Sequence, residues 1–220
     1  MEKVNIGQKI LQANDIHAIR NRRLLEAKKL LCYNLISSPG SGKTTLLVRT
    51  INHLKGRLRW AVIEGDIQTD LDAERIRATE APAIQINTDG ACHLSAVQIQ
   101  DALGKLPLDT LDGVFIENVG NLVCPGAFEL GEQGKIVVLS VAEGDDKPAK
   151  YPAIFAMARV VLINKIDYLA AGFQDDFEME KVRQEVRRLN KQAEIFCLSA
   201  KTGEGFNAWC DWLVEQKAQR

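Results

Sequence analysis

Short apolar runs bounded by turn residues recur along the chain, and each is too short to be a core helix. They cover residues 33–36, 60–63, 114–116, 136–141, 160–163 and 195–198. Residues 73–79, 95–103 and 178–189 lie between such runs and have helical spacing of apolar positions. This alternation predicts an α/β fold with a doubly wound, mostly parallel sheet flanked by helices.

Ahead of the first predicted strand, residues 6–31 carry apolar side chains at mostly helical spacing among many charges. This pattern predicts an N-terminal amphipathic helix docked beside the core. We therefore expect a helical extension over residues 1–31 and one large α/β domain over residues 32–220, with a loop at residues 170–176.

The amino-acid composition argues against nucleic acid and membranes as partners and against disulfide bonds. Basic and acidic residues nearly cancel, giving a net charge of -1, so no overall field favours nucleic acid or an anionic membrane. No apolar run approaches the roughly twenty residues of a spanning helix, and the N-terminus lacks a secretory core. Five scattered cysteines argue against a disulfide framework. We expect a cytoplasmic protein with no nucleic-acid or membrane partner and with reduced thiols.

A phosphate-binding loop follows the first predicted strand. Residues 37–45 read SSPGSGKTT and lead into a helical run at residues 46–54. Backbone N–H groups and the helix N-terminus would face the phosphates, Lys43 would neutralise the β- and γ-phosphates, and Thr44 would ligate Mg²⁺. Ser37 departs from the pattern, which usually has glycine there. The residues expected to bind nucleotide are Gly40, Ser41, Gly42, Lys43, Thr44 and Thr45.

Two later strands end in motifs that select guanine. Residues 160–163 lead into Asn164, Lys165 and Asp167, and residues 195–198 lead into Ser199, Ala200 and Lys201. The Asp167 carboxylate can accept from the N1–H and amino group of guanine, which adenine does not present together. The Lys165 stem can cover the base and the Ala200 N–H can donate to O6. The order of the motifs predicts GTP and GDP as ligands.

Carboxylates end two intervening strands. Asp66 follows the strand at residues 60–63, and Glu117 follows the strand at residues 114–116. We expect both to face Mg²⁺ and the attacking water, and we expect the Gly120 N–H to contact the γ-phosphate. The expected catalytic residues are thus Lys43, Asp66, Glu117 and Gly120, with Asp72 a weaker candidate. A helix cap or a solvated loop is the structural alternative for either acid.

Cys92, His93 and Cys124 form a candidate metal site, because thiolate and imidazole ligands suit Zn²⁺ or Ni²⁺. Three ligands leave a tetrahedron open, which fits an exchangeable or inter-subunit site better than a closed structural one. The alternative is two buried thiols and a surface histidine. Cys124 lies just beyond the Glu117–Gly120 segment, so nucleotide state could move a ligand. The other cysteines lie in apolar surroundings and are expected in the core.

Three strings make the chain resemble the HypB family of hydrogenase nickel-insertion GTPases, over nearly its whole length. They are ENVGNLVCP at residues 117–125, TDGACHL at residues 88–94 and EGDDKP at residues 143–148. The resemblance implies a P-loop GTPase domain, a GTP-promoted homodimer, and Ni²⁺ or Zn²⁺ held near the interface by Cys92, His93 and Cys124. It also implies nickel transfer, with a HypA-type metallochaperone, into the hydrogenase large subunit.

The chain departs from some family members, since it has neither their N-terminal cysteine motif nor a histidine-rich tract. We therefore expect neither nickel storage nor a tight N-terminal nickel site. Three alternatives stay open. These are a urease-type nickel accessory GTPase, whose cysteine and histidine flank a proline, a regulatory GTPase switch with no metal role, and a metal-binding module with a vestigial nucleotide pocket.

Overall fold

The computed structural model describes residues 6–66, 71–172 and 177–220, and the side chains of residues 11–65, 74–172 and 177–220. Its centre is a seven-stranded sheet in the order β3-β2-β4-β1-β5-β6-β7, in which every neighbouring pair is parallel. The strands are β1 (Leu31–Ser37), β2 (Trp60–Asp66), β3 (Ala83–Asn87), β4 (Gly113–Glu117), β5 (Gly134–Ser140), β6 (Ala158–Asn164) and β7 (Glu194–Cys197). The predicted doubly wound parallel sheet is confirmed.

β1 occupies the point where the strand order reverses. It pairs with β4 on one side and with β5 on the other, and all seven of its residues are buried. In open parallel sheets, ligands bind beyond the carboxyl ends of the strands at such a point. The segment that follows Ser37 is therefore the expected place for a ligand.

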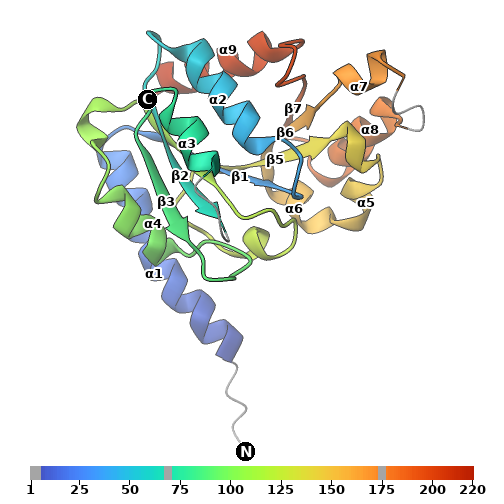
Figure 1. The fold of residues 1–220 in the computed structure, drawn as a ribbon. Coiled ribbons are helices and arrows are strands. Elements are labelled where there is room, and N and C mark those ends of the chain that lie inside the picture. Colours follow the sequence, from blue (N-terminus) through green and yellow to red (C-terminus); the bar gives the residue numbers. More distant parts are fainter. Residues whose placement is uncertain (1–5, 67–70, 173–176) are drawn as a thin grey trace, which may run out of the picture.

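Helices cover both faces of the sheet (Figure 1). They are α1 (Ile6–Ala27), α2 (Lys43–Leu54), α3 (Leu71–Arg77), α4 (Ala96–Leu103), α5 (Lys147–Lys150), α6 (Pro152–Met157), α7 (Asp167–Ala170), α8 (Met179–Leu189) and α9 (Phe206–Ala218). Side chains of α2, α3 and α9 pack on one face, and those of α1, α4, α6 and α8 pack on the other. The result is a three-layer α/β/α domain with a core on each side of the sheet.

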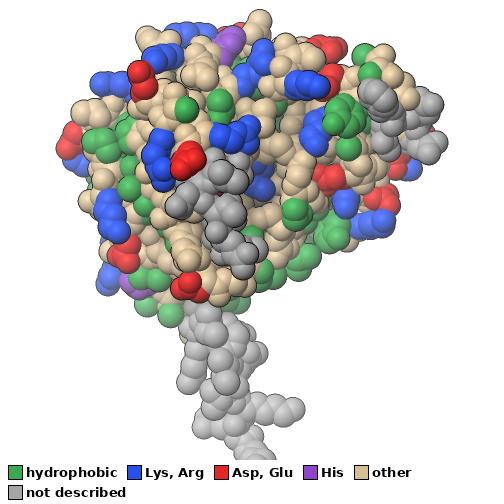
Figure 2. All heavy atoms as spheres, in the orientation of Figure 1, with side chains coloured by type: hydrophobic (Ala, Val, Ile, Leu, Met, Phe, Trp, Pro, Cys, Tyr) green, Lys and Arg blue, Asp and Glu red, His purple; other side chains and the backbone are tan. Residues whose placement is uncertain are grey.

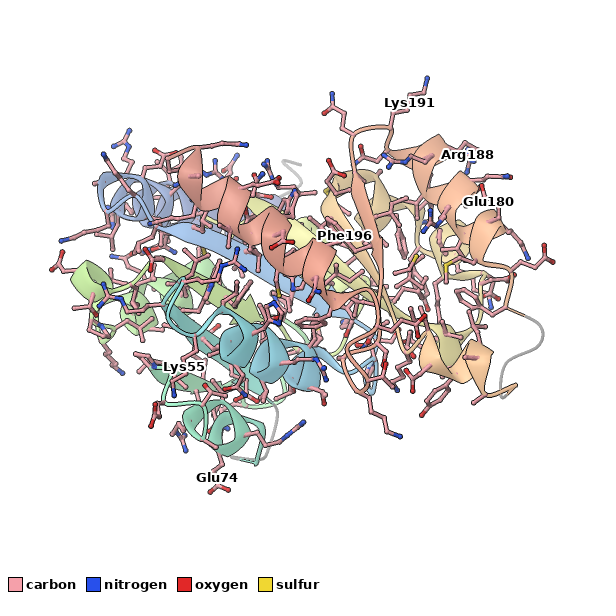
Figure 3. All side chains as sticks on the ribbon, turned by 90° about the horizontal axis from the view of Figure 1, so that it is seen from above. Lys55, Glu74, Glu180, Arg188, Lys191 and Phe196 are labelled. Carbon is pink, nitrogen blue, oxygen red and sulfur yellow. The ribbon has the colours of Figure 1, made fainter. Side chains whose placement is uncertain are left out.

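Aromatic side chains anchor the first of these cores. Trp60 of β2 stacks on Phe115 of β4 with ring centroids 4.0 Å apart. Phe196 of β7, labelled in Figure 3, meets Trp209 and Trp212 of α9 edge-on, with centroids 6.1 and 6.3 Å apart. Offset and edge-on pairs of this kind add to the stability that burial itself provides.

α1 packs against the rest of the domain from Asn14 onward, while its first turns project beyond the sheet (Figure 1). Ala18 and Leu25 are 3% and 1% exposed. The Asn21 amide donates to the carbonyls of Ala96 and Leu130 at 2.8 and 2.9 Å. The predicted helix is present, and the division of the chain at residue 31 stays a prediction.

β3 is the strand that the apolar pattern missed. It is an edge strand whose residues are half-buried or exposed, so its sequence AIQIN lacks a continuous apolar run. The helices α5, α6, α7 and α9 were not expected either, and Ala170, the first residue of the predicted loop, is the last residue of α7. Of the predicted loop at residues 170–176, residues 173–176 lie outside the described part of the chain.

Basic and acidic side chains are interspersed over the face drawn in Figure 2, in agreement with the near-zero net charge. Within the described ranges, no helix combines the length and the apolar character that crossing a bilayer requires.

Candidate functional site

A cavity of about 380 Å³ opens at the carboxyl end of β1, where the topology places a ligand. It lies against the loop that follows β1, the start of α2, and the ends of β2 and β4. Its lining residues are Pro39, Gly40, Ser41, Gly42, Lys43, Thr44, Thr45, Glu64, Gly65, Arg75, Glu117, Asn118, Val119 and Gly120.

The loop after β1 is held around the Ser37 hydroxyl. Ser37 Oγ accepts from Lys43 Nζ at 2.8 Å and from Ser41 Oγ at 2.6 Å, so the serine that departs from the usual pattern positions the lysine. Gly42 has φ 94°, and a Cβ there would lie 2.8 Å from Asn164 Nδ2. Only glycine fits both the left-handed backbone and this close approach.

Thr44 and Glu117 meet at the floor of the cavity. Thr44 Oγ1 donates to Glu117 Oε1 at 2.8 Å, and the two residues are 6% and 5% exposed. A hydroxyl beside a carboxylate is a donor set that Mg²⁺ prefers, so these residues fit the predicted ion. The backbone of Asp66 ends β2, but the side chains of Asp66 and Asp72 lie outside the described part of the chain, and their roles stay predictions.

Two further charged residues line the cavity although no motif pointed to them. Glu64 is 3% exposed and lies opposite Glu117 in the register of β2 and β4, so their side chains leave the sheet on the same face. Arg75 reaches the cavity from α3 and donates to Thr45 Oγ1 at 2.8 Å. No sequence motif predicts an arginine at this position of the cavity.

Asn164 joins the phosphate loop to the segment that carries Ala200. Its Nδ2 donates to the Ser41 carbonyl at 2.9 Å, and its Oδ1 accepts from the Ala200 N–H at 3.0 Å. If the Ala200 N–H also donates to guanine O6, as predicted, it must be shared between O6 and Asn164 Oδ1. Lys165, with an unusual φ of 64°, donates to the Gly40 carbonyl at 2.8 Å. The predicted guanine motif and the phosphate loop are thus one connected structure.

Asp167 is the first residue of α7, directly beyond this connection. Its Oδ1 is buried and has no hydrogen-bond partner among the described residues. A buried acceptor without a donor is costly. A ligand that brings two adjacent N–H donors, as guanine does, would satisfy it. Ser199 is fully buried, while Lys201 is exposed on the neighbouring turn.

The predicted metal ligands come together outside the cavity. Cys92, His93 and Cys124 each offer one ligand atom, and these three atoms lie within 4.8 Å of one another. Cys92 Sγ is 3.4 Å from His93 Nδ1, and the imidazole stacks on the Phe128 ring at 3.9 Å. Thiolate and imidazole ligands at these separations fit Zn²⁺ or Ni²⁺, with a fourth position open.

The protonation of these groups bears on metal binding. Burial lowers the pKa of His93, which keeps the imidazole neutral and able to ligate. A hydrogen bond with the Cys124 thiol, and secondarily burial, raises the pKa of Cys92. A metal ion must therefore displace a proton from Cys92 when it binds.

Of the remaining cysteines, Cys32 and Cys210 are buried, as predicted. Burial raises the pKa of Cys210 to about 12, which makes its thiol inert. Cys197 differs from the prediction, because it is only half-buried and accepts from Arg183 Nη2 at 3.2 Å.

Asn121 lies between two of the metal ligands. Its Nδ2 donates to the Cys92 carbonyl at 3.4 Å, and its Oδ1 accepts from the Cys124 N–H at 3.4 Å. Gly120 packs against the phosphate loop, since a Cβ there would lie 3.0 Å from Pro39 Cγ. The chain from Glu117 to Cys124 thus runs from the cavity to the metal triad.

Comparisons with known proteins point to one family. Residues 31–197 match the family model described as "CobW/HypB/UreG, nucleotide-binding domain". The hydrogenase maturation factor HypB of Escherichia coli K12 is 52% identical over 208 residues, which cover 94% of this chain and 71% of that protein. The hydrogenase/urease maturation factor HypB of Helicobacter pylori is 40% identical, covering 98% and 89%. The crystal structure of HypB from Helicobacter pylori in complex with nickel superposes with a TM-score of 0.87 at 40% identity, over 94% of this chain and 96% of that one.

Proposed function

Because the chain belongs to the HypB branch of the CobW/HypB/UreG family of nucleotide-binding proteins, we propose that it is a GTP-hydrolysing metallochaperone that assists nickel insertion into hydrogenase. One observation carries the proposal. The triad of Cys92, His93 and Cys124 lies at the end of the same short segment that begins with Glu117 in the nucleotide cavity.

Hydrolysis of GTP is assigned to residues of the cavity, and recognition of the base is assigned to Asp167, outside the cavity lining. Asp167 selects guanine through its buried carboxylate oxygen. Lys43, 9% exposed, supplies positive charge where the transferring phosphoryl group would sit. Glu117 fixes the Thr44 hydroxyl and orients the attacking water, and the Gly120 N–H contacts the γ-phosphate. Mg²⁺, held by Thr44 and Glu117 with Asp66 as a further ligand, would neutralise charge on the phosphates.

The metal triad suits transfer rather than storage. Three ligands hold an ion, and the open fourth position lets a ligand from outside the chain take part. Cys92 is exposed, so such a ligand can approach. We assign that outside ligand to a second copy of the chain in a GTP-promoted homodimer, and the subsequent steps to a HypA-type metallochaperone and the hydrogenase large subunit.

A urease-type role is the second candidate. One observation favours it, namely that the Helicobacter pylori relative is named a maturation factor of both hydrogenase and urease. The adjacent placement of Cys92 and His93 favours the hydrogenase role, because the urease accessory GTPases that the chain resembles have a proline between the two ligands.

The proposal is tested by metal analysis together with solution mass, measured on the GDP-bound and the GTP-analogue-bound protein. We expect nickel or zinc bound through the triad and a dimer in the GTP-analogue state. Cys92→Ala and Cys124→Ala should each lose the metal while still binding GDP. A monomer without metal in both states would leave a regulatory switch as the better account.

A further inference from the structure

The Asn118 side chain contacts two segments of the backbone. One is its own segment, from Glu117 to Cys124, and the other is the loop that carries the metal ligands Cys92 and His93. Asn118 Oδ1 accepts from the Leu94 N–H at 3.1 Å and from the Val119 N–H at 3.0 Å. The residue is 1% exposed, so neither bond is shared with solvent. One buried oxygen atom thus binds the backbone of two segments that are distant in the sequence.

Each of the two residues bonded to Asn118 is adjacent in sequence to a residue with a role in the proposed function. Leu94 directly follows the metal ligand His93, and Val119 directly precedes Gly120, the proposed γ-phosphate contact. The Leu94 N–H shares one planar peptide unit with the His93 carbonyl, so the Asn118 oxygen fixes the backbone directly after His93. Val119 is bonded directly to Gly120, so displacement of Gly120 by a nucleotide would act on the same oxygen through the backbone of Val119.

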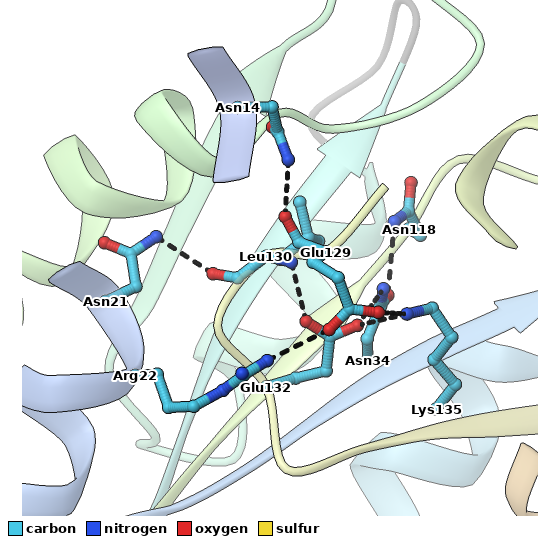
Figure 4. Close-up of polar contacts among 9 residues, drawn as sticks. All are labelled: Asn14, Asn21, Arg22, Asn34, Asn118, Glu129, Leu130, Glu132 and Lys135. Atoms are coloured by element: carbon cyan, nitrogen blue, oxygen red, sulfur yellow. Dashed lines mark hydrogen bonds and ion pairs between the residues drawn. The ribbon is translucent and has the colours of Figure 1, made fainter. Parts of the chain in front are cut away.

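Buried polar groups fix the orientation of the Asn118 amide (Figure 4). Asn118 Nδ2 donates to Asn34 Oδ1 at 3.1 Å, and Asn34 Nδ2 donates to Glu132 Oε1 at 3.3 Å. Lys135 Nζ lies 3.1 Å from the same Glu132 oxygen. The side chains of Glu132 and Lys135 are 1% and 5% exposed, and Asn34 is fully buried. Because every partner is buried and directional, the amide cannot rotate without leaving a polar group unpaired.

This polar network is anchored to the helical layer. Glu132 Oε2 accepts from the Leu130 N–H at 2.7 Å, and the Leu130 carbonyl accepts from Asn21 of α1. Arg22, also on α1, pairs with Glu129 at 3.0 Å, and Glu129 contacts Lys135 (Figure 4). The Asn118 side chain is thus held by a polar network that reaches α1, and its Oδ1 is the contact that joins the two loops.

Close packing limits how far either loop can yield. Leu94 is fully buried, and a Cβ on Gly65 at the end of β2 would lie 2.7 Å from Leu94 Cγ. Interiors packed at this density switch between discrete arrangements rather than deforming gradually. The half-buried Asn121 makes a second contact between the loops, but its bond to Cys92 is longer, at 3.4 Å.

We propose that Asn118 is the positioning residue through which nucleotide state controls the geometry of the metal triad. The proposal rests on the proposed function, and it names the residue that links the nucleotide site to the metal site. Asn118 itself binds neither the phosphates nor the metal. It selects between two placements of the loop that carries Cys92 and His93, according to the position of Val119 and Gly120.

The test is the ratio of nickel dissociation constants in the GDP and GTP-analogue states of the full chain. Typical couplings between two sites give ratios of about 5 to 150. Asn118→Ala should bring the ratio to within about twofold of one. Asn190→Ala is the matched control, because the Asn190 side chain also binds the backbone of two residues, here by donating to the carbonyls of Ala156 and Ala158, away from both sites. It should leave the ratio unchanged.

An unchanged ratio in Asn118→Ala would overturn the proposal while leaving nickel binding and hydrolysis in place. If that variant does not fold, amide hydrogen exchange on the unmodified protein serves instead. The Leu94 N–H should exchange at rates that differ by at least severalfold between the two nucleotide states, and equal rates would overturn the proposal. Absence of nickel binding in either state of the unmodified protein would instead contradict the proposed function itself.

Discussion

The Thr44 hydroxyl donates to the Glu117 carboxylate at 2.8 Å and so joins the first turn of α2 to the end of β4, 73 positions apart in the chain. Both side chains belong to the lining of the cavity that also contains Lys43. The phosphate loop and the segment leading to Cys124 are thereby in direct contact on the floor of the site.

Substitution of either charged residue on this floor should impair hydrolysis. Lys43→Ala should abolish it, because the phosphoryl group loses its buried cation. Glu117→Ala should slow it by about a hundredfold, the cost typical of removing one polar group from a catalytic site, and leave GDP bound. Phosphate release and GDP affinity are the measurements. Lys55→Ala, an exposed lysine just beyond α2 (Figure 3), is the control and should turn over normally. Undiminished turnover in Lys43→Ala or Glu117→Ala would remove that residue from the mechanism.

Asp167→Asn should change the base that the protein prefers. The substitution replaces an acceptor oxygen with a donor, so guanine meets a mismatched group and xanthine becomes the better partner. We expect a loss of about 1–3 kcal/mol in GDP binding. Competition binding with guanine, xanthine and adenine nucleotides measures it. Equal affinity of the unmodified protein for GTP and ATP would contradict the assignment.

Arg75→Ala should lower the rate of hydrolysis by about tenfold or more, because a cation lining the cavity can stabilise charge on the phosphates. Single-turnover kinetics at saturating GTP separate this effect from binding. Arg77 lies on the same short helix and does not line the cavity, so Arg77→Ala is the matched control. Equal rates in the two variants would assign Arg75 a structural role through its bond to Thr45.

Nickel affinity should increase as pH rises above neutrality. The neighbouring Cys124 raises the pKa of Cys92, so the thiol is protonated at neutral pH and metal binding must release that proton. Burial lowers the pKa of His93, so the imidazole is already neutral there and adds little to the pH dependence. Calorimetric titration in buffers of different ionisation enthalpy counts the protons released. An affinity that stays constant from about pH 6.5 to 8.5 would mean that Cys92 is not a ligand.

Much of this architecture followed from the sequence because local pattern and chemistry agree. In the phosphate loop and in the segment from Asn164 to Asp167, the residues that bind the ligand are nearly contiguous in the sequence, so each motif can be identified without the structure. The buried strands are visible as apolar runs. β3 was missed because it is an edge strand with a weak pattern. Arg75 and Asn118 were missed because their roles depend on contacts made only in the folded chain. The departure of Ser37 from the usual glycine proved to have a specific use, since its hydroxyl binds Lys43.

Nickel titration of the GDP and GTP-analogue forms, with Cys92→Ala and Cys124→Ala alongside, tests the central claim most directly. The unmodified protein should bind nickel with different affinities in the two nucleotide states, and nickel should change GTP affinity by the same factor, because coupling between two sites is reciprocal. Each cysteine variant should bind nickel more weakly and lose the difference between states. Identical affinities and stoichiometries across all of these samples would contradict the account and leave a GTP-binding protein whose three clustered ligands have no role in metal delivery.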